Sequence, residues 1–299
     1  MMNHGNDYQL NIVKKLFGEQ TFKFLQSYLD AVNNFYGAPL EMVDFLHNPE
    51  ITRQQINSWI QQQTKGKIQN LLPEDSVSPN TALAVANTLY FLANWTAPFS
   101  ERGTTKAPFI LTPNEQVIVN MMNNEGIFNT NNINSHGITI LELPYGLTKA
   151  LSMFILLPDN NTVLAKMDKG ISYEKLSQWT SSENMNLNHI TVQLPRFRME
   201  QRFSLRKILS SLGMSSAFSQ VRANFSGMEK FGKLYLSDVY HKTFIEVNEK
   251  GTEAASATAG VVSIRSIPDG EFKADRPFHF FIRHNRTKCI LLYGKLCKP

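Results

Sequence analysis

The chain has 299 residues, 42% of them hydrophobic, and a formal net charge of +5 at pH 7. This hydrophobic fraction supplies a sizeable core, which argues against a disordered protein. The basic residues are scattered, which argues against a nucleic-acid site, and no apolar run approaches a membrane span in length.

The first third of the chain predicts alternating strands and helices. Residues 8–17 form a short apolar run that predicts a strand, and residues 21–36 carry apolar side chains at helical spacing. A short strand is expected over 40–45. Thr52 is expected to cap a second helix that ends at Gln63.

The remaining two thirds predict mostly strands. Residues 81–95 mix apolar and small side chains, which is typical of a long strand buried on both faces. One further helix is expected over 205–212, closed by Gly213. Shorter β-like runs occupy residues 117–122, 138–143, 152–157, 189–194, 234–248, 278–283 and 289–293. The pattern predicts a mixed α+β chain with several sheets, organised as one domain over residues 1–299.

Cysteine usage and the start of the chain bear on the compartment. The two cysteines, Cys289 and Cys297, exclude a disulfide framework and fit a reducing environment. The first residues are polar and lack the apolar stretch of a signal peptide. A cytoplasmic location is therefore favoured, with an extracellular location as the alternative.

Standard catalytic motifs are absent from the sequence. There is no G-x-S-x-G elbow, P-loop, Rossmann glycine fingerprint or H-E-x-x-H helix. His279 and His284 fit ordinary strand and turn positions better than metal ligands. A Ser-His-Asp set can assemble across a fold, but no residue points to one. We therefore expect a protein that is not an enzyme and that uses neither a metal nor a cofactor.

Residues 249–260 carry the strongest functional signal. They follow a well-marked strand but offer no large side chain to bury. In extended form, one face would hold only small uncharged residues, namely Thr252, Ala254, Ser256, Thr258 and Gly260. Small residues are poor strand formers, so the pattern indicates a loop that becomes a strand later. A flexible loop of small residues is the alternative interpretation.

The next segment, residues 261–268, has the features of an exposed bait for a protease. Its one basic residue, Arg265, is followed by the small Ser266. This pair suits a trypsin-like pocket with an acidic base. Alone, Arg265 fits an incidental surface arginine equally well.

Several passages together resemble the serpin family, in particular its ovalbumin-type members. Residues 241–255 resemble the family's hinge signature, and residues 274–283 resemble its segment beyond the reactive loop. Residues 87–91, followed by Trp95, resemble the long third strand of its main sheet. The resemblance covers the chain from about residue 7 to its end, in the family's order.

The resemblance implies a fold of three β-sheets with surrounding helices and an exposed reactive loop at about residues 251–271. It places the reactive bond between Arg265 and Ser266 and implies a suicide-substrate mechanism. A trypsin-like serine protease would be trapped as a covalent acyl complex when the cut loop enters the main sheet. The inhibitor is expected to be a monomer that binds neither nucleic acid nor membrane.

The resemblance also assigns supporting residues. Asn87 and His241 match the shutter, the polar cluster beneath the opening point of the main sheet. Trp95, Arg196 and Glu249 match the breach, where insertion begins. The hinge comprises Glu249, Gly251, Thr252, Glu253, Ala254, Ala255, Ser256, Ala257 and Thr258. A small residue at 252 favours an inhibitory member.

The sequence departs from the family at its beginning. The family's first four helices and first small strand have no counterpart in the chain. The shutter residues are therefore expected to lack their usual partners. Two alternatives stay open, a non-inhibitory serpin with a carrier, storage or chaperone-like role, and an inactive truncated isoform.

Overall fold

The computed structural model describes residues 2–4, 8–252 and 267–299. The chain divides into two compact units. The first consists mainly of Leu10–Phe91 and Met199–Phe244, and the second mainly of Leu92–Arg198 and Ile245–Pro299. β4 (Leu83–Asn94) and β11 (Asp238–Asn248) contribute residues to both units. Single-domain organisation stays a prediction.

The first unit is built on a parallel pairing of β4 with β11. The two strands are in register from Ala84 opposite Asp238 to Tyr90 opposite Phe244. The other elements of this unit are β2 (Tyr8–Glu19), α1 (Gln26–Tyr36), β3 (Leu40–Val43), α2 (Pro49–Gln63), most of β10 (Phe197–Ser204) and α5 (Arg206–Leu209). A core cluster centred on Leu83, Phe218 and Leu234 packs at one end of the paired strands.

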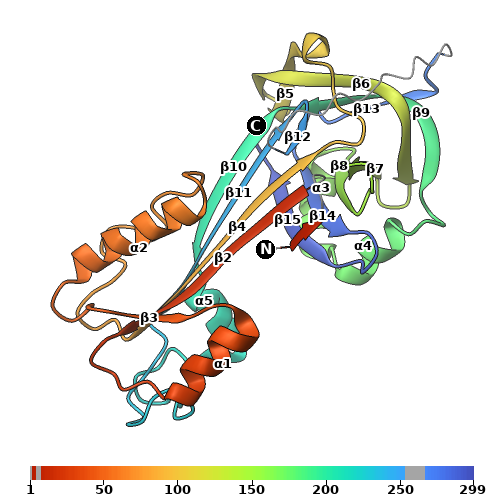
Figure 1. The fold of residues 1–299 in the computed structure, drawn as a ribbon. Coiled ribbons are helices and arrows are strands. Elements are labelled where there is room, and N and C mark those ends of the chain that lie inside the picture. The colour runs from red at the N-terminus through yellow and green to blue at the C-terminus, as the bar shows by residue number, and fades with distance from the viewer. Residues whose placement is uncertain (1, 5–7, 253–266) are drawn as a thin grey trace. The chain divides into compact units, whose positions relative to one another are not determined.

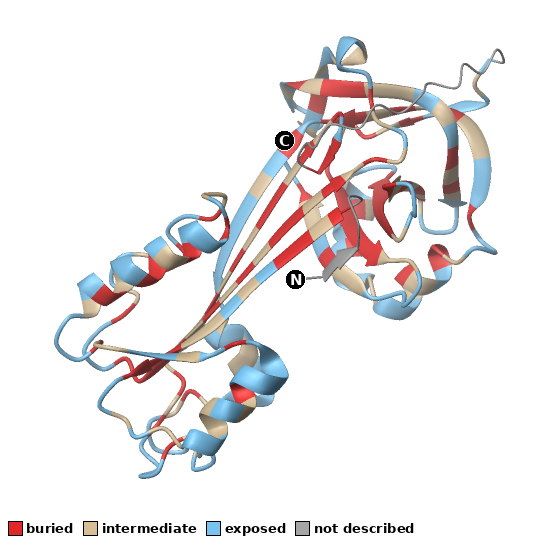
Figure 2. Ribbon diagram, in the orientation of Figure 1, coloured by how far each residue is buried: buried red, intermediate tan, exposed pale blue. Residues whose placement is uncertain are grey.

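The second unit contains a long ladder of strands ordered β13-β9-β6-β7-β8-β14-β15, with β5 paired to β6. Its elements are β5 (Thr105–Thr112), β6 (Glu115–Ile133), β7 (Ile138–Tyr145), β8 (Leu151–Pro158), α3 (Asn161–Gly170), α4 (Tyr173–Trp179), β9 (Asn186–Pro195), β12 (Gly251–Thr252), β13 (Gly270–Lys273), β14 (Phe278–His284) and β15 (Ile290–Leu296). Every residue of β8 is buried, as Figure 2 shows. Phe154 of β8 stacks on Phe281 of β14 in the core beneath α3 and α4.

The described strands form two hydrogen-bonded ladders, of seven and eight strands. The sequence resemblance implies three sheets. The difference arises because β6 is long enough to belong to two layers. Residues 121–130 of β6 pair with β9, and residues 129–133 pair with β7, which joins the layers into one ladder.

The mixed α+β class is confirmed, and most expected strands are present with altered ends. The expected cap at Thr52 is wrong. α2 begins at Pro49 with Asn48 as its N-cap, and Thr52 lies inside the helix, where its hydroxyl donates to the carbonyl of Asp44. The helix expected over 205–212 is α-helical only from Arg206 to Leu209 and then widens into a π-type turn around Gly213.

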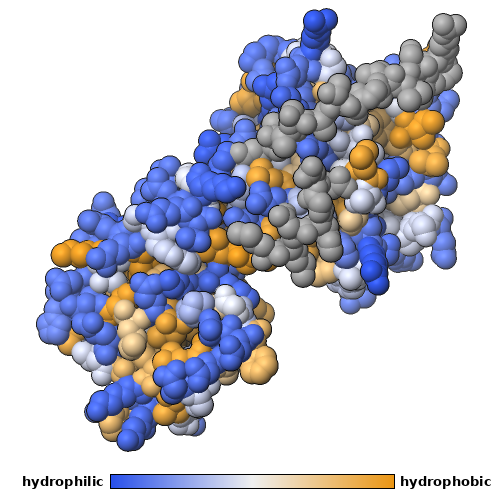
Figure 3. All heavy atoms as spheres, in the orientation of Figure 1, coloured by the Kyte–Doolittle hydropathy of each residue, from blue (hydrophilic) through white to orange (hydrophobic). Residues whose placement is uncertain are grey.

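Surface composition is mixed. Figure 3 shows small apolar areas between larger hydrophilic ones on the visible face. The most exposed large apolar residues lie on separate segments and include Val221, Ile267, Leu147 and Phe35. Single exposed apolar residues are normal in folded proteins, so none of these alone marks a site. Within the described residues, no helix is long and apolar enough to cross a bilayer, and no three potential metal ligands cluster.

The ring of Phe154 provides a direct test of the second unit's core. It is fully buried and stacked on Phe281 at 4.9 Å. Phe154→Ala should lower the free energy of unfolding by about 3–5 kcal/mol, because it removes buried apolar area and leaves a cavity. Urea unfolding measures this. Ile127→Ala, at a side chain that is 60% exposed, should change stability by no more than about 0.5 kcal/mol. If both substitutions lowered the free energy of unfolding equally, the burial of Phe154 in this core would be contradicted.

Candidate functional site

The first two residues of the predicted reactive loop, Gly251 and Thr252, form the short strand β12. Gly251 pairs with Asn94, and Thr252 pairs with Ala93, antiparallel to β4. On the other side β12 pairs antiparallel with β11, with Thr252 opposite Val247. β12 therefore lies between the ends of β4 and β11, and Thr252 is completely buried. The chain reverses at residues 249–250 and re-enters the sheet it has just left.

Gly251 is required at this reversal for two reasons. Its φ of +150° is one that L side chains rarely adopt. A Cβ atom there would lie 2.0 Å from the carbonyl oxygen of Ala93 and 2.6 Å from the Cα of Asn94. Both neighbours are backbone atoms of β4, which cannot move aside like a side chain. The strand can enter the sheet only because this residue has no side chain.

Two buried aromatic side chains contact the chain reversal and β12. Trp95 and Tyr145 are buried and stack with centroids 4.5 Å apart. The indole Nε1 of Trp95 donates to the carbonyl of Asn248 at 3.0 Å, and its backbone N–H donates to the carbonyl of Lys250 at 2.8 Å. Trp95 thus binds one backbone carbonyl before the chain reversal and one within it.

The hydroxyl of Tyr145 lies 2.9 Å from that of Thr252. Burial raises the pKa of Tyr145 far above its ordinary value, although the hydrogen bond with Thr252 opposes the shift. The phenol is therefore neutral and retains its proton for hydrogen bonding. The first inserted side chain thus meets a polar partner in a site without water access.

Glu249 anchors the other end of the reversal. Its side chain is 3% exposed, and its carboxylate accepts from the guanidinium of Arg196 at 2.6 Å and from the hydroxyl of Thr104. Its backbone carbonyl accepts from the N–H of Phe99 at 2.8 Å. Burial alone would raise the pKa of Glu249, but the hydrogen bonds from Arg196 and Thr104 outweigh it, so this pKa is lowered.

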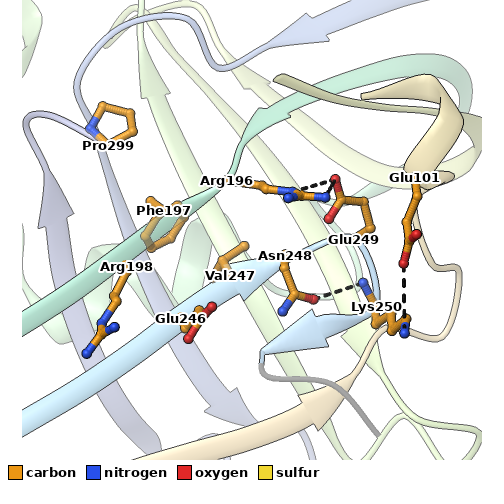
Figure 4. A pocket seen from close by; sticks show the side chains of 10 residues that line it. All are labelled: Glu101, Arg196, Phe197, Arg198, Glu246, Val247, Asn248, Glu249, Lys250 and Pro299. Atoms are coloured by element: carbon orange, nitrogen blue, oxygen red, sulfur yellow. Dashed lines mark hydrogen bonds and ion pairs between the residues drawn. The ribbon is translucent and has the colours of Figure 1, made fainter. Parts of the chain in front are cut away.

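A surface pocket with space for about 450 Å³ adjoins this ion pair, as Figure 4 shows. Three basic and three acidic side chains line it, so it does not select a ligand by net charge. Its lining is Glu101, Arg196, Phe197, Arg198, Glu246, Val247, Asn248, Glu249, Lys250 and Pro299.

The predicted shutter pair also lies together, in the first unit. His241 of β11 is directly opposite Asn87 of β4. Within the described residues, the buried atoms Asn87 Oδ1, Thr88 Oγ1 and His241 Nδ1 have no hydrogen-bond partner. Burial lowers the pKa of His241, partly offset by the backbone of Asn87. Asn87 and His241 are thus neighbours across the β4–β11 pairing, as the family resemblance predicts for the shutter.

The structure brings together the predicted breach residues Trp95, Arg196 and Glu249, and adds Phe99, Thr104 and Tyr145 to them. The added residues carry no local sequence signal as a group, since Thr104 is 145 positions from Glu249 and Tyr145 is 107 positions from Thr252. Several predicted residues lie outside the described part of the chain: Glu253, Ala254, Ala255, Ser256, Ala257, Thr258, Arg265 and Ser266.

Comparisons with known proteins agree on one family. The sequence model described as "Serpin (serine protease inhibitor)" matches residues 1–299. The chain is 43% identical to Serpin B10 of Rhinolophus ferrumequinum over 298 residues, covering 99% of the chain and 75% of that protein. It is 44% identical to human Serpin B12 over 298 residues, covering 98% and 73%. Among solved structures, uncleaved ovalbumin is similar with a TM-score of 0.90 and 35% identity, covering 100% of this chain and 79% of that one.

Replacing Gly251 tests the seating of β12. Gly251→Ala should displace β12 from the sheet, because the added methyl overlaps the backbone of β4. Hydrogen exchange of the peptide containing residues 247–252 should accelerate at least about tenfold, since its amides lose their ladder partners. The matched control is Gly227→Ala, where the added Cβ has no atom within 4 Å. Unchanged exchange in Gly251→Ala would show that β12 is not seated as described.

The carboxylate of Glu249 makes the site sensitive to acid. Because its pKa is below the ordinary value of 4.5 in the folded protein, ionised Glu249 stabilises the fold fully above about pH 4.5, and this contribution is lost as the pH falls through the lowered value. Glu249→Gln should therefore melt below the wild type at pH 7, with a smaller difference at pH 3. Thermal unfolding across this range measures it, with the exposed Glu183→Gln as control. A difference that is independent of pH would contradict the assignment.

Proposed function

The chain belongs to the serpin family of serine protease inhibitors, and we propose that it inhibits a trypsin-like serine protease as a suicide substrate. Family membership supports protease inhibition in general. The observation that supports this mechanism is the position of β12, seated between the ends of β4 and β11. In the proposed mechanism, a longer inserted strand would begin at this position.

The proposed reaction begins as ordinary proteolysis. The serine hydroxyl of the protease attacks the carbonyl carbon of Arg265, and the bond between Arg265 and Ser266 breaks. The amino group of Ser266 leaves with a proton from the protease's general acid, and an ester joins Arg265 to the protease serine. Cleavage frees the segment that begins at Thr252 to extend β12.

Extension of β12 would be favourable on geometric grounds. β4 and β11 are parallel from residues 84–90 and 238–244, and a strand antiparallel to both would form hydrogen bonds along each of its edges. Each such bond contributes about 0.5–1.5 kcal/mol net. The alternating small residues from Thr252 to Gly260 could be buried without placing a charge inside. The attached protease would be carried along before the ester hydrolyses.

Trypsin provides the first test of this proposal. An equimolar mixture should give a band on denaturing gels at the summed mass of the two proteins, because the ester survives SDS. Arg265→Ala should abolish this band, since the trypsin pocket requires a basic residue, whereas Arg286→Ala should leave it unchanged. Clean cleavage after Arg265 without the band would exclude inhibition by this chain and favour a non-inhibitory serpin.

A second measurement tests insertion itself. Chain cut at Arg265 should melt at a higher temperature than intact chain, because the inserted strand would form two ladders of hydrogen bonds in place of the single β4–β11 ladder that it displaces. An unchanged melting temperature would exclude strand insertion.

A further inference from the structure

We infer that Tyr145 is a positioning residue for the hinge, whose hydroxyl recognises the hydroxyl of Thr252 and holds β12 in the sheet of the uncleaved chain. The contact itself stands on geometry, whereas its consequence for inhibition rests on the proposed function above. The two hydroxyl oxygens are 2.9 Å apart, and both residues are almost completely buried.

Tyr145 is held in place by its surroundings. Its ring stacks on Trp95 with an interplanar angle of 13°, and the two residues also form a backbone β-bridge. On either side, the N–H of Gly146 donates to the carbonyl of Asn94 at 2.8 Å, and the N–H of Thr96 donates to the carbonyl of Pro144 at 2.9 Å. The hydroxyl of Tyr145 is therefore held in a fixed position at the end of β7. Thr252 must lie at this position to form the hydrogen bond.

The site distinguishes side chains at position 252 by chemistry and size. A hydroxyl on Cβ reaches Tyr145 and can serve as donor or acceptor. A valine would fill the same space but could not form the hydrogen bond with Tyr145. A charged side chain would be buried in the same place without a counter-ion. Tyr145 thus favours a small hydroxyl residue at the first buried position of the hinge.

The contact should set how much of the uncleaved chain holds β12 in the sheet. Loss of one buried hydrogen bond, worth at most about tenfold in an equilibrium constant, should shift this population by up to about tenfold. A released hinge would have to re-enter the sheet after cleavage, which gives the protease more time to hydrolyse the ester. Removing the contact should therefore convert part of the inhibition into plain cleavage.

Three substitutions test the contact. Tyr145→Phe and Thr252→Val each delete one hydroxyl with little change of shape, and Thr252→Ser retains the hydroxyl. Hydrogen exchange of the peptide containing residues 247–252 should accelerate about tenfold in the first two variants and stay near the wild-type rate in the third. The double variant Tyr145→Phe/Thr252→Val should exchange no faster than the faster single variant, because both changes remove the same bond.

The control is Tyr240→Phe, another buried tyrosine whose hydroxyl donates to the carbonyl of Ser76 in the first unit. It should leave exchange at residues 247–252 unchanged. Wild-type exchange in Tyr145→Phe, or additive effects in the double variant, would overturn the inference. A tenfold change in Tyr240→Phe as well would overturn it too, because the effect would then be general destabilisation.

Inhibition of trypsin provides an independent test of the contact. Tyr145→Phe and Thr252→Val should raise the number of chains consumed per protease inhibited, while the rate of the first cut after Arg265 stays unchanged and Thr252→Ser behaves like the wild type. If the wild type forms the complex and both variants consume the same number of chains per protease inhibited as the wild type, the positioning role is overturned. If the wild type itself forms no complex, the proposed function fails, and the exchange measurements still decide the contact.

Discussion

The fold around the site depends on one constraint, the antiparallel seating of β12 between β4 and β11. A strand can occupy that position only where the flanking strands have stopped pairing with each other. The register shows this change of partner directly. β4 pairs with β11 as far as Tyr90, and beyond it Ala93 pairs with Thr252. The parallel ladder and the inserted strand therefore compete for the same edges, and the balance between them is the property on which strand insertion would act.

The seating of β12 depends on a few residues of the second unit. Gly251 allows close backbone approach to β4, because a Cβ atom there would overlap the backbone of Ala93 and Asn94. Trp95 donates hydrogen bonds to the carbonyls of Asn248 and Lys250, which hold the chain reversal that precedes β12.

Sequence reasoning placed Asn87 beside His241 and Arg196 beside Glu249 through the family resemblance, and the structure shows both pairs together. The strip of small residues beyond Thr252 lies outside the described residues and stays a prediction. Sequence reasoning did not reach α3, α4 or β10. α3 and α4 are short, and β10 exposes most of its residues, so none shows a strong apolar period. Tyr145 could not be assigned a role because its contact with Thr252 depends on tertiary packing. The error at Thr52 has a local cause, since Asn48 and Pro49 supply stronger helix-start signals four and three positions earlier, respectively.

The two polar anchors of the reversal differ in a way that suits their positions. Glu249 lies before the turn, stays paired with Arg196, and has a charge that would oppose its movement into an apolar interior. Thr252 lies after the turn and uses a neutral hydroxyl that can enter the sheet. Both groups are buried, but the charge of Glu249 requires its partner Arg196, whereas the hydroxyl of Thr252 is neutral. The change from a paired charge to a neutral hydroxyl thus occurs within the four residues from Glu249 to Thr252.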